Sequence, residues 1–533
     1  MNRSNSIMNN GIPARGKLER RDFIKAAAAS TALAGAPGWG ALRAAGTAEE
    51  SRQPPADPSK QILFFDEHMV LGMKNVEFAI NRAVKSPRNP VIRGDRPWEG
   101  KTIAEVSVVY DEEQKLFQMW YPVYDYHPPI PPAGAPAAEK IADLVEERKR
   151  CTACYAISKD GHNWEKPNLD WVEFQGSRQN NIIMASSLES RTHFATGHVF
   201  RDPIETDPAK RYKGMKPRMV GGRMVVDLYF SPTGVKWTPS ERNPVFDLNK
   251  PGSWGPTSYM GWDPIRQVYA VYMENCGHQK CPDGKRLIGR AESPDMIHWS
   301  EPDTVLVPDD RDGPYVQPYA LHPTTYREFY IGLLWSHNIR LQNHHPQFVF
   351  SRDGSRFDRR YRDSFIERGT GAEFDSNNLL PIKPIVRGDE IFLFYLAANY
   401  RTPEQFGALG NEKAETSIGL AVVPRDRFVC IQPTKGNTGE VVTRSIRPSG
   451  KKLILNMQIA DGRNGEVKVE IMDSAHWPVS GFALGDADPL TKSGLDITAT
   501  WKGNENIGSV AGKPIKLRIS LKNAQLFSVR FSD

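Results

Sequence analysis

The sequence predicts an all-β protein in which a five-bladed β-propeller is followed by a C-terminal β-sandwich. The first observation is a short phrase with a Ser, a turn containing Asp or Gly, and an aromatic residue. It recurs at residues 158–164 (SKDGHNW), 231–237 (SPTGVKW), 293–299 (SPDMIHW) and 351–357 (SRDGSRF), with a degraded fifth copy from Val423. The second observation is a change of texture after about residue 435, where short alternating strands and turns begin.

Each copy of the phrase is typical of a β-hairpin, because its turn residues permit a tight bend and its aromatic ring packs between sheets. Successive copies begin 73, 62, 58 and 72 residues apart. That spacing leaves room for about four strands in each repeat, which is the size of a propeller blade. Five copies therefore predict five blades. A tandem of β-sandwiches is the alternative, and it explains the recurring turn and aromatic residue less well.

A second phrase precedes each hairpin and combines an apolar strand, a polar turn and an aromatic strand. Its copies lie at residues 106–121, 200–215, 259–273, 319–335 and 385–397. The apolar and polar residues in KLFQMWY and REFYIGLLW alternate with the period of two that a β-strand requires. We place the blades at about 100–180, 190–250, 255–310, 314–370 and 375–432. Residues 60–99 lead in and close the ring, and the one helical stretch expected is 137–150.

The C-terminal segment consists of short strands such as LILNMQIA, EVKVEIMD and IKLRISL, separated by turns such as DGRNG and KGNENIG. About 95 residues of this kind are typical of a β-sandwich. The predicted domains are therefore a leader over residues 1–48, a linker over 49–59, the propeller over 60–434 and the sandwich over 435–533.

The N-terminal segment is typical of an export signal. Arg20 and Arg21 stand in the string ERRDFIK, which is followed by a weakly apolar Ala-rich run and by small residues near Ala48. This string closely resembles the twin-arginine signal, which carries folded proteins out of the cytoplasm. An amphipathic N-terminal helix is the alternative. We therefore expect a periplasmic or secreted protein, without a lipid anchor because no Cys stands near the cleavage region.

The charge distribution argues against a nucleic-acid partner. The 533 residues carry a formal net charge of +6, but residues 1–48 alone hold seven Lys and Arg against Glu19 and Asp22. The rest of the chain is therefore close to neutral, at about +1. Outside the N-terminus no run of about 18 apolar residues occurs, so we expect no contact with a membrane once the signal is removed.

Five cysteines, Cys151, Cys154, Cys276, Cys281 and Cys430, make a complete disulfide framework improbable because their number is odd. The first four can be combined into a four-thiolate zinc site, but the first pair begins a predicted strand, where residues three apart face opposite ways. Buried thiols, or one disulfide between Cys276 and Cys281, fit better. We expect no metal and no organic cofactor.

The candidate site lies where the innermost strands of the blades converge on the central channel. Carboxylates from separate blades that point into one channel suit glycoside hydrolysis, which needs one acid and one base or nucleophile. The candidates, in blade order, are Glu105; His193, His198, Arg201 and Asp202; Glu274; Asp312, Tyr315 and Gln317; and Glu373 and Asp375.

Each candidate also has a purely structural interpretation. Asp202 precedes Pro203 and can cap a turn, and Asp312 can belong to a solvated acidic loop. Glu105 can face solvent, and Glu274 can lie on the rim and bind substrate or nothing. Glu373 and Asp375 can form an exposed loop, and His193 and His198 can be core residues with satisfied hydrogen bonds.

These features together resemble the superfamily of glycoside hydrolase families 32 and 43. The resemblance rests on the five-blade plan, FRDP at 200–203, the SKDGHNW-like hairpins and the terminal sandwich, whose strings VEIMD and GKPIKLRISLKNAQLFSVRF look like those of family 32-like proteins. LFQMWY, CYAISKDGHNWEKP, QNNIIM and DPAKRYKGM resemble a secreted bacterial branch of the superfamily. The resemblance covers about residues 60–533.

The resemblance implies catalysis by three acids. Asp202, with Arg201 beside it, matches the Arg-Asp-Pro motif of the transition-state stabiliser, and Glu105 matches the base or nucleophile by position alone. The Glu-Cys-Pro motif of the general acid is absent, and Glu274 in Glu-Asn-Cys is a loose echo that lies one strand late. Glu373 or Asp375 are substitutes, and the other candidates bind the substrate.

Two further functions remain open. A carbohydrate-binding propeller without catalysis explains why the inner strand of blade three lacks a Glu. A sialidase has a similar hairpin phrase, but its six blades and arginine cluster are not evident in this chain. The preferred hypothesis is an exported glycoside hydrolase whose partner is a poly- or oligosaccharide.

Overall fold

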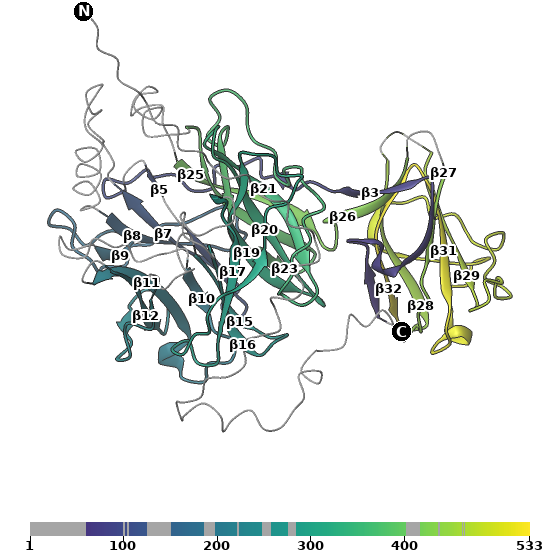
Figure 1. Ribbon diagram of the computed structural model, residues 1–533, viewed down its shortest axis with the longest axis horizontal. Helices are drawn as coiled ribbons and strands as arrows, with labels where there is room; N and C mark the ends of the chain where they lie inside the picture. Colours follow the sequence, from purple (N-terminus) through teal and green to yellow (C-terminus); the bar gives the residue numbers. More distant parts are fainter. Residues whose placement is uncertain are drawn as a thin grey trace, which may run out of the picture. The chain divides into compact units, whose positions relative to one another are not determined.

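The computed structural model (Figure 1) describes most of the chain after residue 59, and all described residues belong to one compact unit, Pro54–Asp533. The described ranges are 60–99, 102–103, 106–124, 151–185, 198–220, 223–247, 257–274, 284–400, 416–434, 438–460, 462 and 464–533. The predicted leader, linker and helix 137–150, together with Glu105, His193, Cys276 and Cys281, lie outside these ranges.

Nearly all described elements are β-strands. The helices within the described ranges are three 3₁₀ turns, η1 (Glu67–Met69), η3 (Pro208–Lys210) and η5 (Gly508–Val510). In this part of the chain no helix has the length and apolar character needed to cross a bilayer. Cys154 and Cys430 are buried and take part in no disulfide.

Five antiparallel sheets follow one another along the chain from Thr102 to Pro424. The first contains β5 (Thr102–Ile103), β6 (Ser107–Asp111), β7 (Leu116–Tyr124), β8 (Cys151–Ser158) and β9 (Ile182–Ala185). The second contains β10 (Val199–Arg201), β11 (Tyr212–Val220), β12 (Arg223–Ser231), β13 (Thr238–Pro239) and β14 (Phe246–Asp247). The third contains β15 (Thr257–Asp263), β16 (Val268–Glu274), β17 (Ile288–Ser293) and β18 (Asp303–Leu306).

The last two sheets complete the series. The fourth contains β19 (Val316–Tyr326), β20 (Phe329–Asn338) and β21 (Asn343–Ser351). The fifth contains β22 (Asn378–Pro381), β23 (Ile385–Arg387), β24 (Glu390–Ala398), β25 (Thr416–Pro424) and β4 (Val84–Lys85). Because β4 pairs with β25, the segment before the first sheet supplies a strand to the last one.

Buried apolar clusters join these sheets into a closed series. Separate clusters fill the spaces between sheets one and two, two and three, three and four, and four and five. A further cluster, which includes Phe117 of sheet one and Phe394 of sheet five, joins the last sheet to the first. Aromatic rings dominate several of these interfaces, which gives each a large buried apolar area. A β-propeller is thereby confirmed, and the blade count of five stays a prediction that these sheets support.

A β-sandwich forms the rest of the described fold. One sheet has the order β3 (Val76–Ile80), β26 (Val429–Pro433), β32 (Ala524–Ser532), β28 (Lys452–Ile459) and β30 (Gly494–Thr498), with β1 (Gln61–Leu63) paired to β32. The other has the order β2 (Val70–Lys74), β27 (Thr438–Thr443), β31 (Lys516–Lys522) and β29 (Glu466–Met472). Alternate residues of β31 are buried against a single apolar core, as the period-two pattern predicts.

The sandwich contains strands that the sequence boundaries assign elsewhere. The first three strands, within residues 61–80, pair with C-terminal strands and appear among them in Figure 1. Strand β26, expected at the end of blade five, also pairs with β3 and β32. The propeller sheets therefore run from Val84 to Pro424, and the expected boundaries at 60 and 434 are corrected accordingly.

The fourth residue of the recurring phrase has a positive φ at every copy, namely Gly161, Gly234, Met296, Gly354 and Asp426. In the second copy the Ser231 hydroxyl accepts from the backbone N–H of Gly234 at 2.8 Å, and the Trp237 indole donates to the Gly234 carbonyl at 2.9 Å. The same carbonyl accepts the indole N–H of Trp120 from the preceding sheet at 2.7 Å. The phrase is therefore both a hairpin turn and a contact between neighbouring sheets.

We expect Gly234→Ala to lower the free energy of unfolding by about 2–4 kcal/mol, because backbone strain and overpacking add. Gly234 has φ of +82°, and a Cβ there would lie 2.4 Å from Cζ2 of the fully buried Trp120. Gly176→Ala is the matched control, since Gly176 has φ of +81° with no atom within 4 Å of a Cβ. Gly176→Ala should lower the free energy of unfolding by only about 1 kcal/mol, the contribution of backbone strain alone. Denaturant unfolding measures both, and equal losses would contradict the packing argument.

Candidate active site

The inner strands β6, β10, β15 and β19 of the first four sheets run side by side, and we call each the first strand of its sheet. Contacts join β6 to β10, β10 to β15 and β15 to β19. Because each sheet is antiparallel, the start of its first strand and the end of its second strand lie at the same end of the ring. We call this the amino end, and the opposite end, where the first strands finish, the turn end.

Glu274 is the last residue of β16 and therefore lies at the amino end. It is 1% exposed, and its Oε2 accepts from Nε of Arg286 at 3.2 Å. Its Oε1 is buried without a hydrogen-bond partner. Burial raises the pKa of Glu274 to about 7, although the Arg286 cation opposes the shift. At neutral pH this carboxyl can therefore hold and release a proton, as a general acid must.

Polar and aromatic side chains of sheet four lie around Arg286, the partner of this carboxyl. The Arg286 guanidinium lies 5.1 Å from the ring centre of Tyr319, and its backbone N–H donates to Gln317 Oε1 at 2.9 Å. The Tyr319 ring meets the rings of His337 and His344 edge-on, with centres 5.2 and 4.9 Å apart. We call these residues the Glu274 cluster: Glu274, Arg286, Gln317, Tyr319, His337 and His344.

The hydrogen bonds of His344 fix the position of its proton. The Asn378 amide nitrogen donates to the Tyr400 carbonyl, so the amide oxygen faces Nδ1 of His344 at 3.0 Å. Nδ1 must therefore carry the proton, and Nε2 is an acceptor. Nε2 is buried without a partner, and burial lowers the pKa of His344 to about 3. The cluster thus offers a neutral acceptor and a protonatable carboxyl, which suit a ligand rich in hydroxyl groups.

Asp202 lies at the turn end, directly after β10. Its carboxylate is 3% exposed and binds the Lys213 ammonium, the Tyr269 hydroxyl at 2.6 Å and the Ile204 N–H at 3.1 Å. Arg201 points to the first sheet, with ion pairs to Glu113 and Asp111. These contacts hold sheets one, two and three together.

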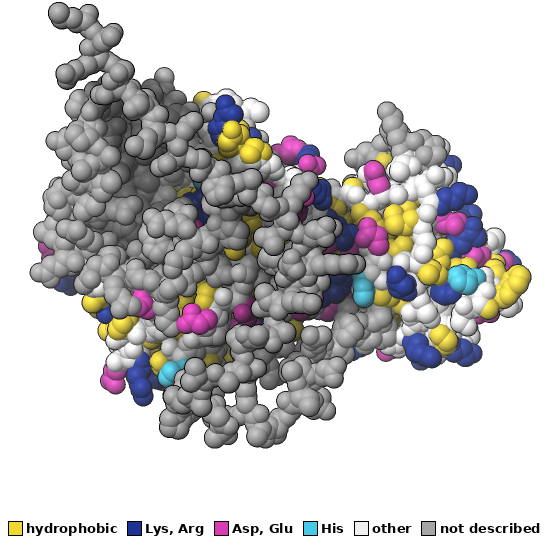
Figure 2. All heavy atoms as spheres, viewed as in Figure 1, with side chains coloured by type: hydrophobic (Ala, Val, Ile, Leu, Met, Phe, Trp, Pro, Cys, Tyr) yellow, Lys and Arg dark blue, Asp and Glu magenta, His cyan; other side chains and the backbone are white. Residues whose placement is uncertain are grey.

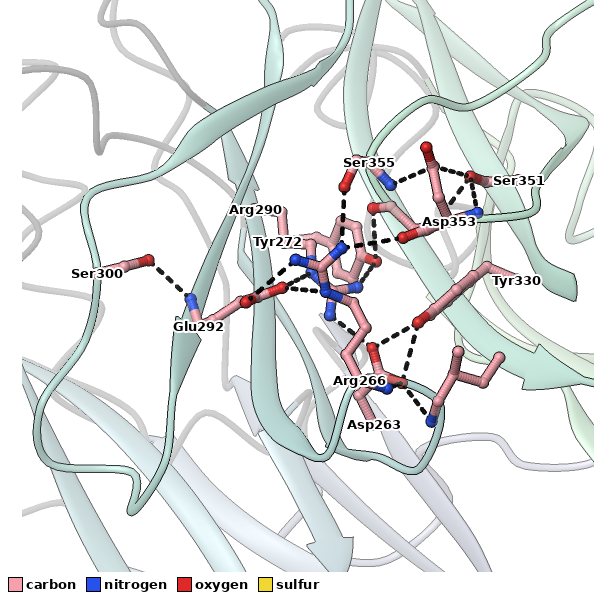
Figure 3. A network of polar contacts seen from close by, with 12 residues as sticks. Asp263, Arg266, Tyr272, Arg290, Glu292, Ser300, Tyr330, Ser351, Asp353 and Ser355 are labelled. Atoms are coloured by element: carbon pink, nitrogen blue, oxygen red, sulfur yellow. Dashed lines mark hydrogen bonds and ion pairs between the residues drawn. The ribbon is translucent and has the colours of Figure 1, made fainter. Parts of the chain in front are cut away.

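Two other sheets repeat the arrangement of Asp202. The Tyr212 hydroxyl donates to Asp111 at 2.5 Å, and the Tyr330 hydroxyl donates to Asp263 at 2.8 Å. In each pair the Asp ends the first strand of one sheet, and the Tyr begins the second strand of the next. Figure 3 shows the third pair, in which Asp263 also binds Arg290. Asp202–Tyr269, Asp111–Tyr212 and Asp263–Tyr330 therefore form a series of Asp–Tyr pairs that join neighbouring sheets.

The structure does not bring Asp202 and Glu274 together. Asp202 binds Tyr269 near the start of β16, and Glu274 ends the same strand five residues later. Five residues of strand span roughly 16 Å. Asp202 and Glu274 therefore contact opposite ends of β16, and their joint part in catalysis stays a prediction.

Three of the other predicted acids are held in turns and ion pairs. Asp312 accepts two hydrogen bonds from Arg359, at 2.7 and 2.8 Å, and one from Arg362. Asp375 pairs with Lys85 at 2.6 Å and accepts from Tyr395. Glu373 is exposed and accepts the N–H of Thr370.

The remaining predicted residues lie in several different places. Gln317 belongs to the Glu274 cluster. His198 is buried at the amino end, just before β10. Tyr315, in contrast, is 43% exposed, with the Arg340 guanidinium over its ring. Glu105 falls in the gap between β5 and β6. Across the described ranges, no three His, Cys, Asp or Glu side chains gather in a way that could hold a metal ion.

Sequence reasoning missed Arg286, Tyr319, His337 and His344. The two histidines are opposite each other in the β20–β21 hairpin, where their rings stack with centres 4.2 Å apart. Their equal spacing from the turn in HNIRLQNHH was a usable signal, because antiparallel strands pair residues symmetrically about a turn. Arg286 and Tyr319 had no comparable local signal, because their contact joins two sheets.

No family model and no curated protein matches this chain. Solved structures match at low identity. A β-1,2-mannobiose phosphorylase from Listeria innocua is 12% identical and matches over 66% of this chain and 97% of that protein, with a TM-score of 0.41. A putative glycoside hydrolase from Parabacteroides distasonis is 10% identical over 64% and 97%, with a TM-score of 0.41. An N-acetylgalactosamine deacetylase from F. plautii is 14% identical over 66% and 96%, also with a TM-score of 0.41.

Proposed function

We propose that the chain is an exported glycoside hydrolase that cleaves glycosidic bonds of poly- or oligosaccharides at the amino end of its propeller. The observation that carries the proposal is the Glu274 carboxyl, whose Oε1 is buried without a partner. The raised pKa, about 7, supports the role of general acid toward the leaving oxygen. Membership of the superfamily of families 32 and 43, and export through the Arg20–Arg21 signal, are parts of the same proposal.

The neighbouring side chains support this role. Arg286 tunes the acidity of Glu274, and Nε2 of His344 accepts a hydrogen bond from a sugar hydroxyl. Glu105 remains the candidate base or nucleophile, on sequence grounds. The catalytic role of Asp202 stays a prediction from the sequence, because the contacts of its carboxylate join neighbouring sheets.

A broad glycan panel tests the proposed function. The full chain is incubated with neutral and acidic poly- and oligosaccharides, and released reducing ends are measured together with binding. We expect hydrolysis of at least one glycan. Measurable binding without release from any glycan would favour the non-catalytic carbohydrate-binding propeller instead.

We expect the rate of hydrolysis to fall as the pH rises through about 7, because only protonated Glu274 can donate to the leaving oxygen. The Arg286 cation lowers the pKa of Glu274, so Arg286→Met should raise it and move this fall to higher pH. A pH profile of kcat/KM for both proteins measures the shift. If the pKa of the basic limb of this profile stayed the same or fell in Arg286→Met, a group other than Glu274 would set that limb.

A further inference from the structure

Lys383 reaches across the ring of sheets. It follows β22 in sheet five, and its Nζ donates to the carbonyl of Met260 on β15 in sheet three at 3.1 Å. Sheet four lies between these two sheets in the order of contacts. A side chain that joins them must therefore pass through the central region that the first strands line.

The charge of Lys383 has no counter-charge. The Met260 carbonyl is its one hydrogen-bond acceptor, and no carboxylate pairs with it in the part of the chain that the structure describes. An ammonium group has three donors, so two remain unused. Burial lowers the pKa of Lys383 to about 8. The Lys383 side chain is only partly buried, so a ligand carboxylate can reach its two unused donors.

The His322 ring lies within electrostatic range of this ammonium group. It lies on β19 of sheet four, is 6% exposed, and has an Nε2 without a hydrogen-bond partner. Burial lowers the pKa of His322 to about 3, and the positive charges of His198 and Lys383 act in the same direction. The Trp335 ring stacks on His322 with centres 4.8 Å apart, and its indole donates to the Pro381 carbonyl, two residues before Lys383.

Aromatic rings connect this pair to the Glu274 cluster. The Tyr319 ring stacks on the Trp335 ring, with ring centres 6.3 Å apart and planes 10° from parallel. The order of contacts from the amino end inward is therefore Arg286, Tyr319, Trp335 and His322, with Lys383 within electrostatic range of the last. The Lys383 cation therefore lies at the inner end of this series of stacked rings.

We propose that Lys383 and His322 form a subsite for the carboxylate of an acidic sugar unit, so that the substrate is a uronate-containing glycan. The inference rests on the proposed function, because it names the substrate class of the same site. The carboxylate accepts from the free Lys383 donors and from the His322 ring in its Nε2–H form. The specificity is local, because the chain after residue 48 carries a net charge of only about +1. Figure 2 shows Lys and Arg side chains among Asp and Glu on the described surface in view.

Binding to a chain that cannot turn over tests the proposal. The full chain carrying Glu274→Gln is titrated by calorimetry with oligogalacturonates and oligoglucuronates, and with the same oligosaccharides after carboxyl reduction. We expect at least one acidic oligosaccharide to bind about 10–100-fold more tightly than its neutral counterpart, the range of one charged hydrogen bond. Lys383→Met should abolish the preference, and Lys383→Arg should keep part of it.

Three results would overturn the proposal. Equal binding of acidic and reduced oligosaccharides removes the carboxylate subsite, and a preference that survives Lys383→Met places it elsewhere. Binding of inorganic phosphate that depends on Lys383, without preference for an acidic oligosaccharide, assigns the pair to a free anion. If Lys383→Met fails to fold, the comparison within the parent chain still decides. If the wild-type chain binds acidic oligosaccharides selectively but hydrolyses none, the proposed function is wrong while the carboxylate subsite is retained.

Discussion

Replacing Glu274 by Gln lowers kcat on an unactivated glycan by about 10²–10⁴-fold, the usual contribution of a general acid. Gln keeps the shape of the side chain and can accept from Arg286, but it has no proton to give to the leaving oxygen. The fold should persist, because the change removes a buried carboxyl that already has one unpartnered oxygen. Initial rates of reducing-end release by the two proteins, with thermal unfolding alongside, measure both effects.

The leaving group provides the control for this variant. The substrate is a dinitrophenyl glycoside of the sugar that the panel identifies. Its dinitrophenolate leaves without protonation, so its release should be nearly as fast in Glu274→Gln as in the wild type. Equal losses on the activated and the natural substrate would mean that Glu274 acts in binding or in shaping the site, and not as the acid.

Replacing Asp202 by Asn lowers the free energy of unfolding by about 3 kcal/mol, because it removes the charge that faces a buried ammonium group. Lys213 keeps Glu205 at 2.9 Å, and Asn can still accept from Tyr269. The loss therefore comes from the ion pair and not from a cavity. We expect kcat per folded molecule to stay within about twofold of the wild type, since the Glu274 cluster lies at the other end of the ring.

Asp263→Asn is the matched control for Asp202. Asp263 has the same place in the next sheet, with Tyr330 and Arg290 as partners, and Arg290 keeps Glu292 at 2.8 Å (Figure 3). Denaturant unfolding should give similar losses for the two variants, because their contacts are alike. A normal unfolding curve for Asp202→Asn together with lost activity would return Asp202 to the catalytic machinery.

The repeating sheets could be predicted because each copy of the phrase specifies its own turn. Ser231, Gly234 and Trp237 form their hairpin from contacts within seven residues, so a local pattern reports a local structure. The boundaries of the sandwich could not be predicted in this way. Residues 61–80 pair with strands more than 300 residues later, and period-two strands look alike whichever sheet they join.

The candidate site shows the same division. The sequence identified Glu274 and Asp202 as polar residues beside strands, but a role depends on which end of the ring each strand end reaches. The pattern FRDP does not contain that information, since it depends on which strand pairs with which. Lys383 was missed because its importance comes from a contact across the ring, and an isolated lysine has no sequence signal.

The central claim is that chemistry occurs at Glu274 and that Asp202 joins sheets. The most direct test is kcat on one natural glycan for Glu274→Gln and Asp202→Asn, each divided by the fraction of molecules that are folded. The structure predicts a loss of at least about 10²-fold for Glu274→Gln and an almost unchanged value for Asp202→Asn. Full activity in Glu274→Gln, with activity lost in folded Asp202→Asn, would contradict the claim.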